Sequence, residues 1–141
     1  MDHVSVVVDD LAAAIAFFAE LGMELEGQAR LGGPSVDRLN ALEGIEVDIA
    51  MVRTPDGHGR LELTKFHHPA VVSPEPAGAL GNTLGLRSVM FTVDDIDATV
   101  AALAAHGGKL IGEVVQYEDS YRLCYLRGPA DIIVALAEEL G

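Results

Sequence analysis

The sequence has almost nothing with which to form covalent cross-links. Of its 141 residues, one is cysteine and none is tryptophan, and aromatic residues make up 5%. Cys124 cannot form an internal disulfide because it has no second cysteine to pair with. Its place in the apolar run RLCYL indicates a small core side chain rather than a reactive thiol. A disulfide-stabilised scaffold is therefore excluded.

Basic residues are also scarce. Nine Lys and Arg stand against 22 Asp and Glu, which gives a formal net charge of -13. Such a chain repels phosphate backbones and anionic lipid, so neither nucleic acid nor a membrane is expected as a partner. No apolar run approaches the roughly 20 residues of a membrane helix, and the chain begins with a strand-like run rather than a secretory leader. We expect a soluble, cytoplasmic protein.

Apolar residues, by contrast, are plentiful: they make up 50% of the chain, and the mean hydropathy is +0.29. The length and composition predict a single domain. The sequence also repeats itself, because residues 3–25 match residues 88–110 at nine of 23 positions. For a chain this rich in Ala and Val, chance would give roughly two matches, so the chain is predicted to contain two copies of one unit.

Each copy begins with a strand followed by a helix. Val4, Val6 and Val8 fall on one face of a predicted strand, and His3, Ser5 and Val7 fall on the other, as expected of a half-buried strand. Asp10 and Asp95 are predicted N-caps of the two helices, while Gly22 and Gly107 fit the C′ positions that end them.

Further strands are predicted after each helix, with no second long helix and only a short helical turn near SVDRLNAL. They span residues 24–31, 46–54 and 60–66 in the first copy, and 109–117, 121–127 and 132–138 in the second. Both copies therefore read β-α-β-β-β, an α+β class. We expect one domain, 1–141, with module one at 1–66, a Pro- and Gly-rich linker at 67–85 and module two at 86–141.

Paired modules of this kind, with VDDL or VDDI after the first strand and the ending RGPADIIVALAEEL, resemble the vicinal oxygen chelate (VOC) superfamily. That superfamily includes glyoxalase I, methylmalonyl-CoA epimerase, extradiol dioxygenases, and fosfomycin and bleomycin resistance proteins. The resemblance covers the whole chain. It implies two tandem modules whose sheets curl around a concave pocket, and we expect a homodimer that binds a small molecule.

The resemblance also implies where a metal would bind, because metal-binding members place ligands on the first and last strands of each module. Those places fall on His3 and Glu62 in module one, and on Ser88 and Ala135 in module two. The expected lining of the pocket consists of Ser88, Ala135, Ser5, Met90, Arg60 and Tyr121.

One histidine and one carboxylate fall short of the three protein ligands of a catalytic zinc or a non-haem iron. The expected cofactor is a divalent metal (Ni, Co, Zn, Mn or Fe) held by His3 and Glu62, or none. Loop residues that could complete a site are His58, His67, His68, Glu118 and Asp119. If unmetallated and buried, Glu62 becomes a candidate catalytic base.

Two functions stay open, and so does the question of whether the protein is an enzyme. The favoured one is a ligand-sequestering protein with a reduced metal site, similar to bleomycin resistance proteins. A cationic or polyaromatic ligand would suit the acidic chain, with Tyr117, Tyr121 and Tyr125 as stacking faces. The alternative is a metal-dependent, glyoxalase- or epimerase-like lyase or isomerase acting on a small oxygenated substrate.

An anionic substrate would instead need cationic partners. Arg53, Arg60 and Arg122 lie on predicted strands and are the candidates for that role, although they would equally suit pairing with an acidic surface.

Overall fold

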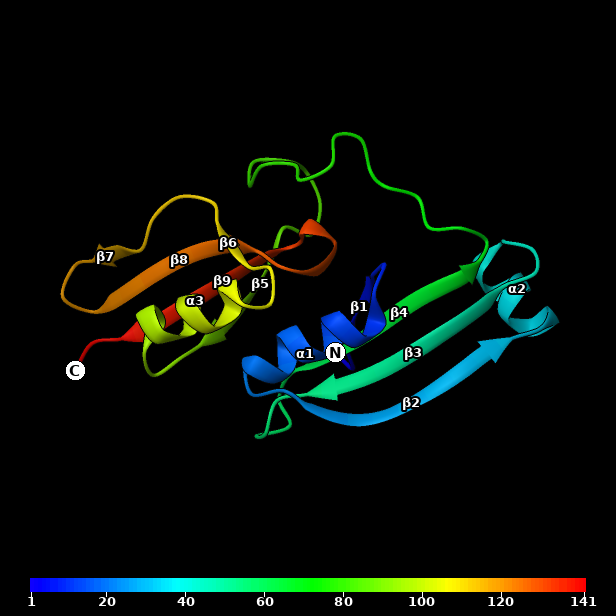
Figure 1. Ribbon diagram of the computed structural model, residues 1–141, viewed down its shortest axis with the longest axis horizontal. Coiled ribbons are helices and arrows are strands. Elements are labelled where there is room, and N and C mark those ends of the chain that lie inside the picture. Colours follow the sequence, from blue (N-terminus) through cyan, green and yellow to red (C-terminus); the bar gives the residue numbers. More distant parts are fainter. The chain divides into compact units, whose positions relative to one another are not determined.

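A computed structural model describes residues 1–141 and divides them into two compact units, Met1–Ser73 and Pro74–Gly141. Each unit contains one small sheet and one helix of nine or ten residues, so the α+β class and the duplication are confirmed (Figure 1). The predicted limits of the modules and linker, 1–66, 67–85 and 86–141, stay a prediction. No helix combines the length and apolar character needed to cross a bilayer.

The first unit is a four-stranded sheet in the order β1-β4-β3-β2. Strand β1 is parallel to β4, whereas β3 is antiparallel to both of its neighbours. Its elements are β1 (Val4–Val7), α1 (Leu11–Glu20), β2 (Glu24–Gly32), α2 (Pro34–Asn40), β3 (Glu46–Arg53) and β4 (Arg60–His68). The short helix α2 lies in the connection between β2 and β3 (Figure 1).

Helix α1 begins and ends where the sequence predicts. The Asp10 side chain accepts a hydrogen bond from the Ala13 amide at 3.0 Å, which satisfies a free N–H of the first turn. Gly22 follows the C-cap residue with φ +91°, a left-handed conformation that favours glycine. Phe17 and Phe18 are buried and pack edge to face against each other.

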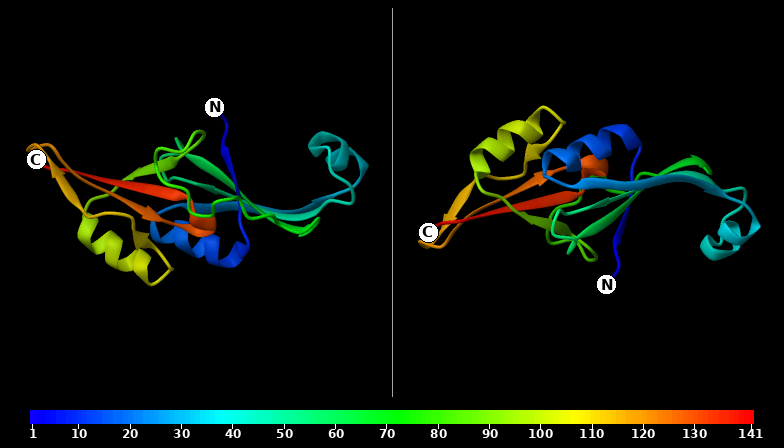
Figure 2. Two further views of the ribbon diagram at one scale, coloured as in Figure 1. Left: turned by 90° about the horizontal axis from the view of Figure 1, so that it is seen from above. Right: turned by 90° about the horizontal axis from the view of Figure 1, so that it is seen from below.

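The first sheet therefore has two different faces. One carries the buried Val6, Ala50 and Leu63 and is covered by α1, as Figure 2 shows. The opposite face, here called the far face, is formed by the alternate residues of each strand. On β1, β3 and β4 they include Ser5, Val7, Ile49, Met51, Arg53, Arg60, Glu62 and Thr64, and His3 directly precedes β1 on the same side.

The second unit repeats this plan. Its sheet has the order β5-β9-β8-β6, with β7 paired to β8, and β5 is parallel to β9. Its elements are β5 (Ser88–Thr92), α3 (Ile96–Ala104), β6 (Lys109–Leu110), β7 (Val115–Tyr117), β8 (Tyr121–Arg127), the 3-10 turn η1 (Pro129–Asp131) and β9 (Ile133–Glu139). Helix α3 buries Ile96 and Leu103 and packs on β9.

Two expectations for the second unit are wrong. The single strand at 109–117 is two short strands, because the chain leaves the ladder around Gly112, a residue that weakens strands. Gly107 is not the C′ residue of α3, since the C-cap is Ala105 and Gly107 lies two positions beyond it with φ +85°. The predicted N-cap Asp95 is confirmed by a 3.0 Å hydrogen bond from the Ala98 amide.

Candidate ligand site

The far face of the first unit brings together the two predicted metal ligands. His3 precedes β1 and Glu62 lies on β4, and their nearest atoms, Nε2 and Oε2, are 3.6 Å apart. The two side chains are 30% and 25% exposed. The parallel pairing of β1 with β4 accounts for this proximity, because it sets Ser5 directly beside Glu62.

Two hydroxyl groups hold the Glu62 carboxylate. Ser5 Oγ donates to Oε1 at 2.9 Å, and Thr64 Oγ1 donates to the same oxygen at 3.2 Å. Thr64 is itself buried, at 6% exposure, so its hydroxyl is fixed by packing. Oε1 is thus occupied, whereas Oε2 is directed at His3.

The other side of the His3 ring contacts Asp2. His3 Nδ1 lies 2.6 Å from Asp2 Oδ2, and this hydrogen bond, helped by the charge of Arg60, lowers the pKa of Asp2. An ionised carboxylate only accepts, so Nδ1 carries the proton. The second ring nitrogen, Nε2, faces Oε2 of Glu62.

Arg60 fixes Asp2 in turn. Its Nη1 donates to both Asp2 oxygens at 3.1 and 3.0 Å, while its Nε and Nη2 donate to Glu26 Oε2 at 3.1 and 2.9 Å. The hydrogen bond to Glu26 is the main reason that the pKa of Arg60 is raised. Arg60 was predicted to line the pocket, and its guanidinium N–H groups bind the protein's own carboxylates.

Sequence reasoning missed Asp2, Glu26 and Thr64. Asp2 is adjacent to His3, and Thr64 stands two positions after Glu62 on the same strand face, so both had a usable signal. No sequence signal pointed to Glu26, because its hydrogen bonds with Arg60 join two residues that only the tertiary structure brings together.

The equivalent places in the second unit offer different chemistry. Met90 pairs with Ala135 across β5 and β9, as Ser5 pairs with Glu62 in the first unit. Ala135 is fully buried, whereas its neighbours Met90 and Tyr125 are 56% and 54% exposed. Ser88 is exposed, and this face supplies no carboxylate or imidazole at those positions.

The remaining predicted pocket residue, Tyr121, lies at the start of β8 and is 42% exposed. With Tyr117, its partner on β7, and Tyr125 it forms an exposed aromatic row on one face of the second sheet.

The first-unit residues suggested as extra metal ligands have other partners. His58 lies 3.8 Å from Asp56, and His67 Nε2 contacts Asp48 Oδ2 at 2.7 Å. His68 packs against Gly44, where an added Cβ would lie 3.1 Å from its ring.

In the second unit, the backbone carbonyl of Glu118 accepts from Gln116, and neither Glu118 nor Asp119 makes a side-chain hydrogen bond or ion pair. Nowhere does the chain gather three His, Cys, Asp or Glu side chains into a group suited to a metal. His3 and Glu62 alone do not fit the three-ligand site of a catalytic zinc.

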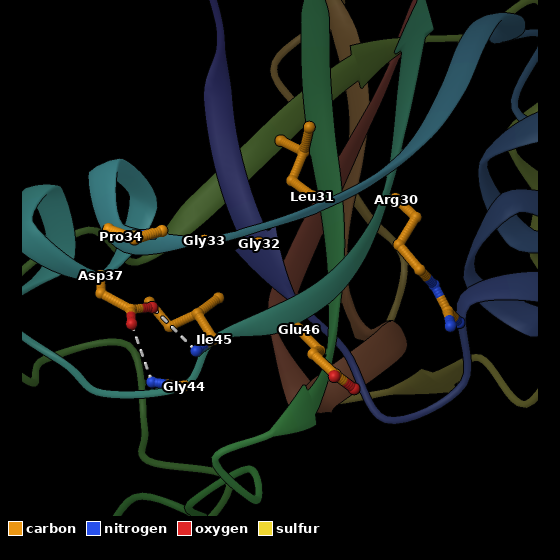
Figure 3. A pocket seen from close by; sticks show the side chains of 9 residues that line it. All are labelled: Arg30, Leu31, Gly32, Gly33, Pro34, Asp37, Gly44, Ile45 and Glu46. Atoms are coloured by element: carbon orange, nitrogen blue, oxygen red, sulfur yellow. Dashed lines mark hydrogen bonds between the residues drawn. The ribbon is translucent and has the colours of Figure 1, made fainter.

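A hollow of about 440 Å³ lies away from these residues, between α2 and the ends of β2 and β3 (Figure 3). Asp37 is turned toward the backbone there and accepts from the Gly44 and Ile45 amides at 2.9 and 2.8 Å. These bonds lower the pKa of Asp37. The Arg30 guanidinium donates to Asp48 at 2.8 Å, so the main polar groups of this hollow serve the fold.

A family model described as "Glyoxalase/Bleomycin resistance protein/Dioxygenase superfamily" matches residues 1–136. The chain belongs to this superfamily. The expected resemblance to glyoxalase-like proteins is thereby confirmed, while the superfamily name covers binding proteins and enzymes alike.

Three known proteins illustrate what this chain is similar to in sequence or in fold. A glyoxalase family protein from Bacillus cereus is 52% identical, with a TM-score of 0.93 over 100% of this chain and 94% of its own. The uncharacterized protein YaeR of Escherichia coli (strain K12) is 27% identical over 97% of this chain and 94% of its length. The trypanothione-dependent glyoxalase I of Leishmania major, at 18% identity, has a TM-score of 0.64 over 98% of this chain and 85% of its own, which shows the fold alone.

Proposed function

We propose that this protein binds a small organic molecule on the far face of its first unit and sequesters it, in the manner of bleomycin resistance proteins. His3 and Glu62 are the polar anchor. The observation that carries the proposal is the fixed carboxylate of Glu62, with one oxygen held by Ser5 and Thr64 and the other directed at His3.

Preorganisation is the reason that this arrangement suits binding. A side chain already held in one rotamer loses little conformational entropy when a ligand arrives. The hydroxyls of Ser5 and Thr64 hold Glu62, and Asp2 holds His3. Sequestration is favoured over turnover because Ser88 and Ala135 occupy two of the four places where metal-binding members of the superfamily have ligands, and neither residue is a usual metal ligand.

A binding screen tests this proposal. The purified protein is screened by thermal shift against a library of small metabolites and antibiotics, and each hit is titrated by calorimetry. We expect stoichiometric binding that Glu62→Gln weakens, with the ligand recovered unchanged by mass spectrometry. Recovery of a chemically altered ligand would reject sequestration.

The alternative function is that of a metal-dependent lyase or isomerase. In its favour, a metal-binding histidine ordinarily donates its second ring N–H to a carboxylate, as His3 does to Asp2. Calorimetric titration of metal-stripped protein with nickel, cobalt, zinc, manganese and ferrous iron decides between them. Tight binding that is lost in both His3→Ala and Glu62→Ala would favour the alternative, and Ser88→Ala is the matched control.

We further propose a homodimer. Both sheets carry apolar side chains with large exposed fractions, including Val7 in the first unit and Met90 in the second. Sedimentation velocity measures the mass directly, and a species at the 14.9 kDa mass of one chain at every concentration would reject the dimer.

A further inference from the structure

We infer that two copies of this chain pack face to face through their second sheets, with the strands of one copy antiparallel to those of the other. The surface involved is the face of that sheet opposite α3, here called the tyrosine face. This inference rests on the proposed homodimer and names the surface that forms it, and it does not depend on the ligand.

The tyrosine face is basic at one end. Its side chains are the alternate residues of each strand, and the register of the strands orders them in rows across the sheet. Lys109 on β6 pairs with Arg127 at one end of β8. Arg127 donates to backbone carbonyl oxygens only, so no carboxylate of the chain pairs with its charge. Positive charge is therefore available at this end of the face.

The other end of the face is acidic. Tyr121, at the opposite end of β8, pairs with Tyr117 on β7 and with Glu139 on β9. Glu118 and Asp119 lie in the turn between β7 and β8 and add negative charge. The rise of a strand sets this end about 20 Å from the basic end.

Between its two ends the tyrosine face is uncharged and apolar. Met90, Val115 and Tyr125 are each at least half exposed there. The rows between Arg127 and Tyr121 contain no charged side chain. Contiguous exposed apolar surface is a mark of interaction sites, and Tyr and Met are enriched in the cores of protein interfaces. This composition indicates a protein partner.

The face complements itself, which identifies the partner as a second copy. A two-fold axis that lies between two such sheets, perpendicular to their strands, places the basic end of one copy over the acidic end of the other. Both β6 and β7 pair with β8 on the edge away from β9, so Lys109 comes over the turn that carries the partner's Glu118. Stacked sheets commonly pack in this aligned way, with their strand directions within about 30° of each other.

Charge also disfavours the corresponding face of the first sheet. With a net charge of -13, two copies repel each other unless they meet where negative charge is not in excess. The far face of the first unit carries Arg53, Arg60 and Glu62, and their burial against an identical face would cost hydration. The tyrosine face, in contrast, has an uncharged centre and opposite charges at its ends.

A charge placed at the centre of the tyrosine face tests the surface. Met90→Glu should raise the dissociation constant of the dimer by about tenfold or more, because a buried carboxylate loses its hydration. Leu25→Glu adds the same charge to a half-exposed residue of the first sheet and should leave the constant unaltered. Sedimentation velocity over a concentration series measures the constant, since the dimer has twice the 14.9 kDa mass of one chain. Circular dichroism checks that both variants are folded.

Reversal of charge at the two ends tests the orientation. Lys109→Glu and Glu118→Lys should each weaken the dimer by about tenfold at low salt, because like charges then meet across the interface. The double variant should recover the wild-type constant. The two residues lie about 20 Å apart within one chain, so recovery arises only from contacts between copies.

Each result bears on the inference. Equal losses in Met90→Glu and Leu25→Glu would indicate a general effect of added charge and overturn it. A dimer that survives Met90→Glu would also overturn it, and the homodimer would then stand on another surface. A double variant that does not recover would overturn the antiparallel arrangement. If the wild type keeps the mass of one chain at every concentration, the dimer and this inference are both rejected, while the ligand screen still decides sequestration.

Discussion

Across β1 and β4 of the first unit, Ser5 lies beside Glu62; across β5 and β9 of the second, Met90 lies beside Ala135. The strand pairing is the same, but the side chains placed on it are not. The N-cap aspartates, Asp10 and Asp95, accept the same hydrogen bond in both units. The duplicated module thus keeps the helix caps and the strand pairing and differs in the side chains at these paired positions.

The largest expected effect comes from giving the second unit the carboxylate of the first. Ala135 is fully buried, so Ala135→Glu would place an unpaired charge and extra volume in a packed site. We expect a loss of stability of about 3–5 kcal/mol, the cost of an uncompensated buried charge. Urea unfolding measures it, and the deficit should shrink at acidic pH as the carboxyl becomes protonated.

The reverse substitution sharpens this comparison. Glu62→Ala removes the acceptor of Ser5 and Thr64 on a partly exposed face. It should cost about 1 kcal/mol, as for an ordinary hydrogen bond. Equal losses in Ala135→Glu and Glu62→Ala would contradict the assignment of different environments to the two places.

Truncation of a core side chain should destabilise the protein by a similar amount in either unit. Phe18 on α1 and Leu103 on α3 occupy matched positions of the repeat, and both are fully buried. Phe18→Ala should cost about 3–5 kcal/mol and Leu103→Ala about 2–5 kcal/mol, because each leaves a cavity. Urea unfolding monitored by circular dichroism provides the values, and a loss below about 1 kcal/mol in either variant would place that side chain outside a packed core.

The N-caps give a smaller effect that should be equal in the two units. Asp10→Ala and Asp95→Ala each remove one hydrogen bond to a first-turn amide, at 3.0 Å in both cases. Each is expected to cost about 1 kcal/mol. Thermal unfolding of the two variants compares them, with Asp10→Asn and Asp95→Asn as controls that retain a capping side chain.

The smallest effect concerns acid stability. Hydrogen bonds from Arg30 and His67 hold the pKa of Asp48 far below its usual range, whereas Arg122 alone lowers that of Asp97. A lowered pKa contributes stability above the unfolded value of about 3.9, and this contribution disappears as pH falls through the folded value. Asp48→Asn should therefore destabilise the protein at pH 7 and become neutral in strong acid, with Asp97→Asn showing a weaker form of the same trend.

Unfolding curves at pH 7, 4 and 2 would test this. A constant difference between wild type and Asp48→Asn across that range would show that the carboxyl has an ordinary pKa in the folded protein.

Much of the fold could be predicted because its signals are local. The alternating valines, the N-cap aspartates and the internal repeat each act over a few residues or recur at a fixed offset. The break between β6 and β7 had a local signal in Gly112, a residue that weakens strands, but the prediction of one strand over residues 109–117 gave that signal too little weight.

The candidate site was predictable in part for the same reason. His3 and Glu62 were predicted through the family resemblance, and Ser5 lay within the strand pattern. The chain of contacts from Glu26 through Arg60 and Asp2 to His3 joins residues far apart in the sequence. The spacing of residues along the sequence does not predict such contacts, because they depend on the register between strands.

Arg127 sets the free length of the connection between the units. Its guanidinium donates to the carbonyl oxygens of Gly78 and Ala79 at 2.7 and 2.8 Å, which ties the end of the connection to the second sheet. Only residues 69–77 then remain between the end of β4 and this anchor, a stretch that reaches at most about 30 Å. One arginine thus decides how much of the connecting chain acts as a tether.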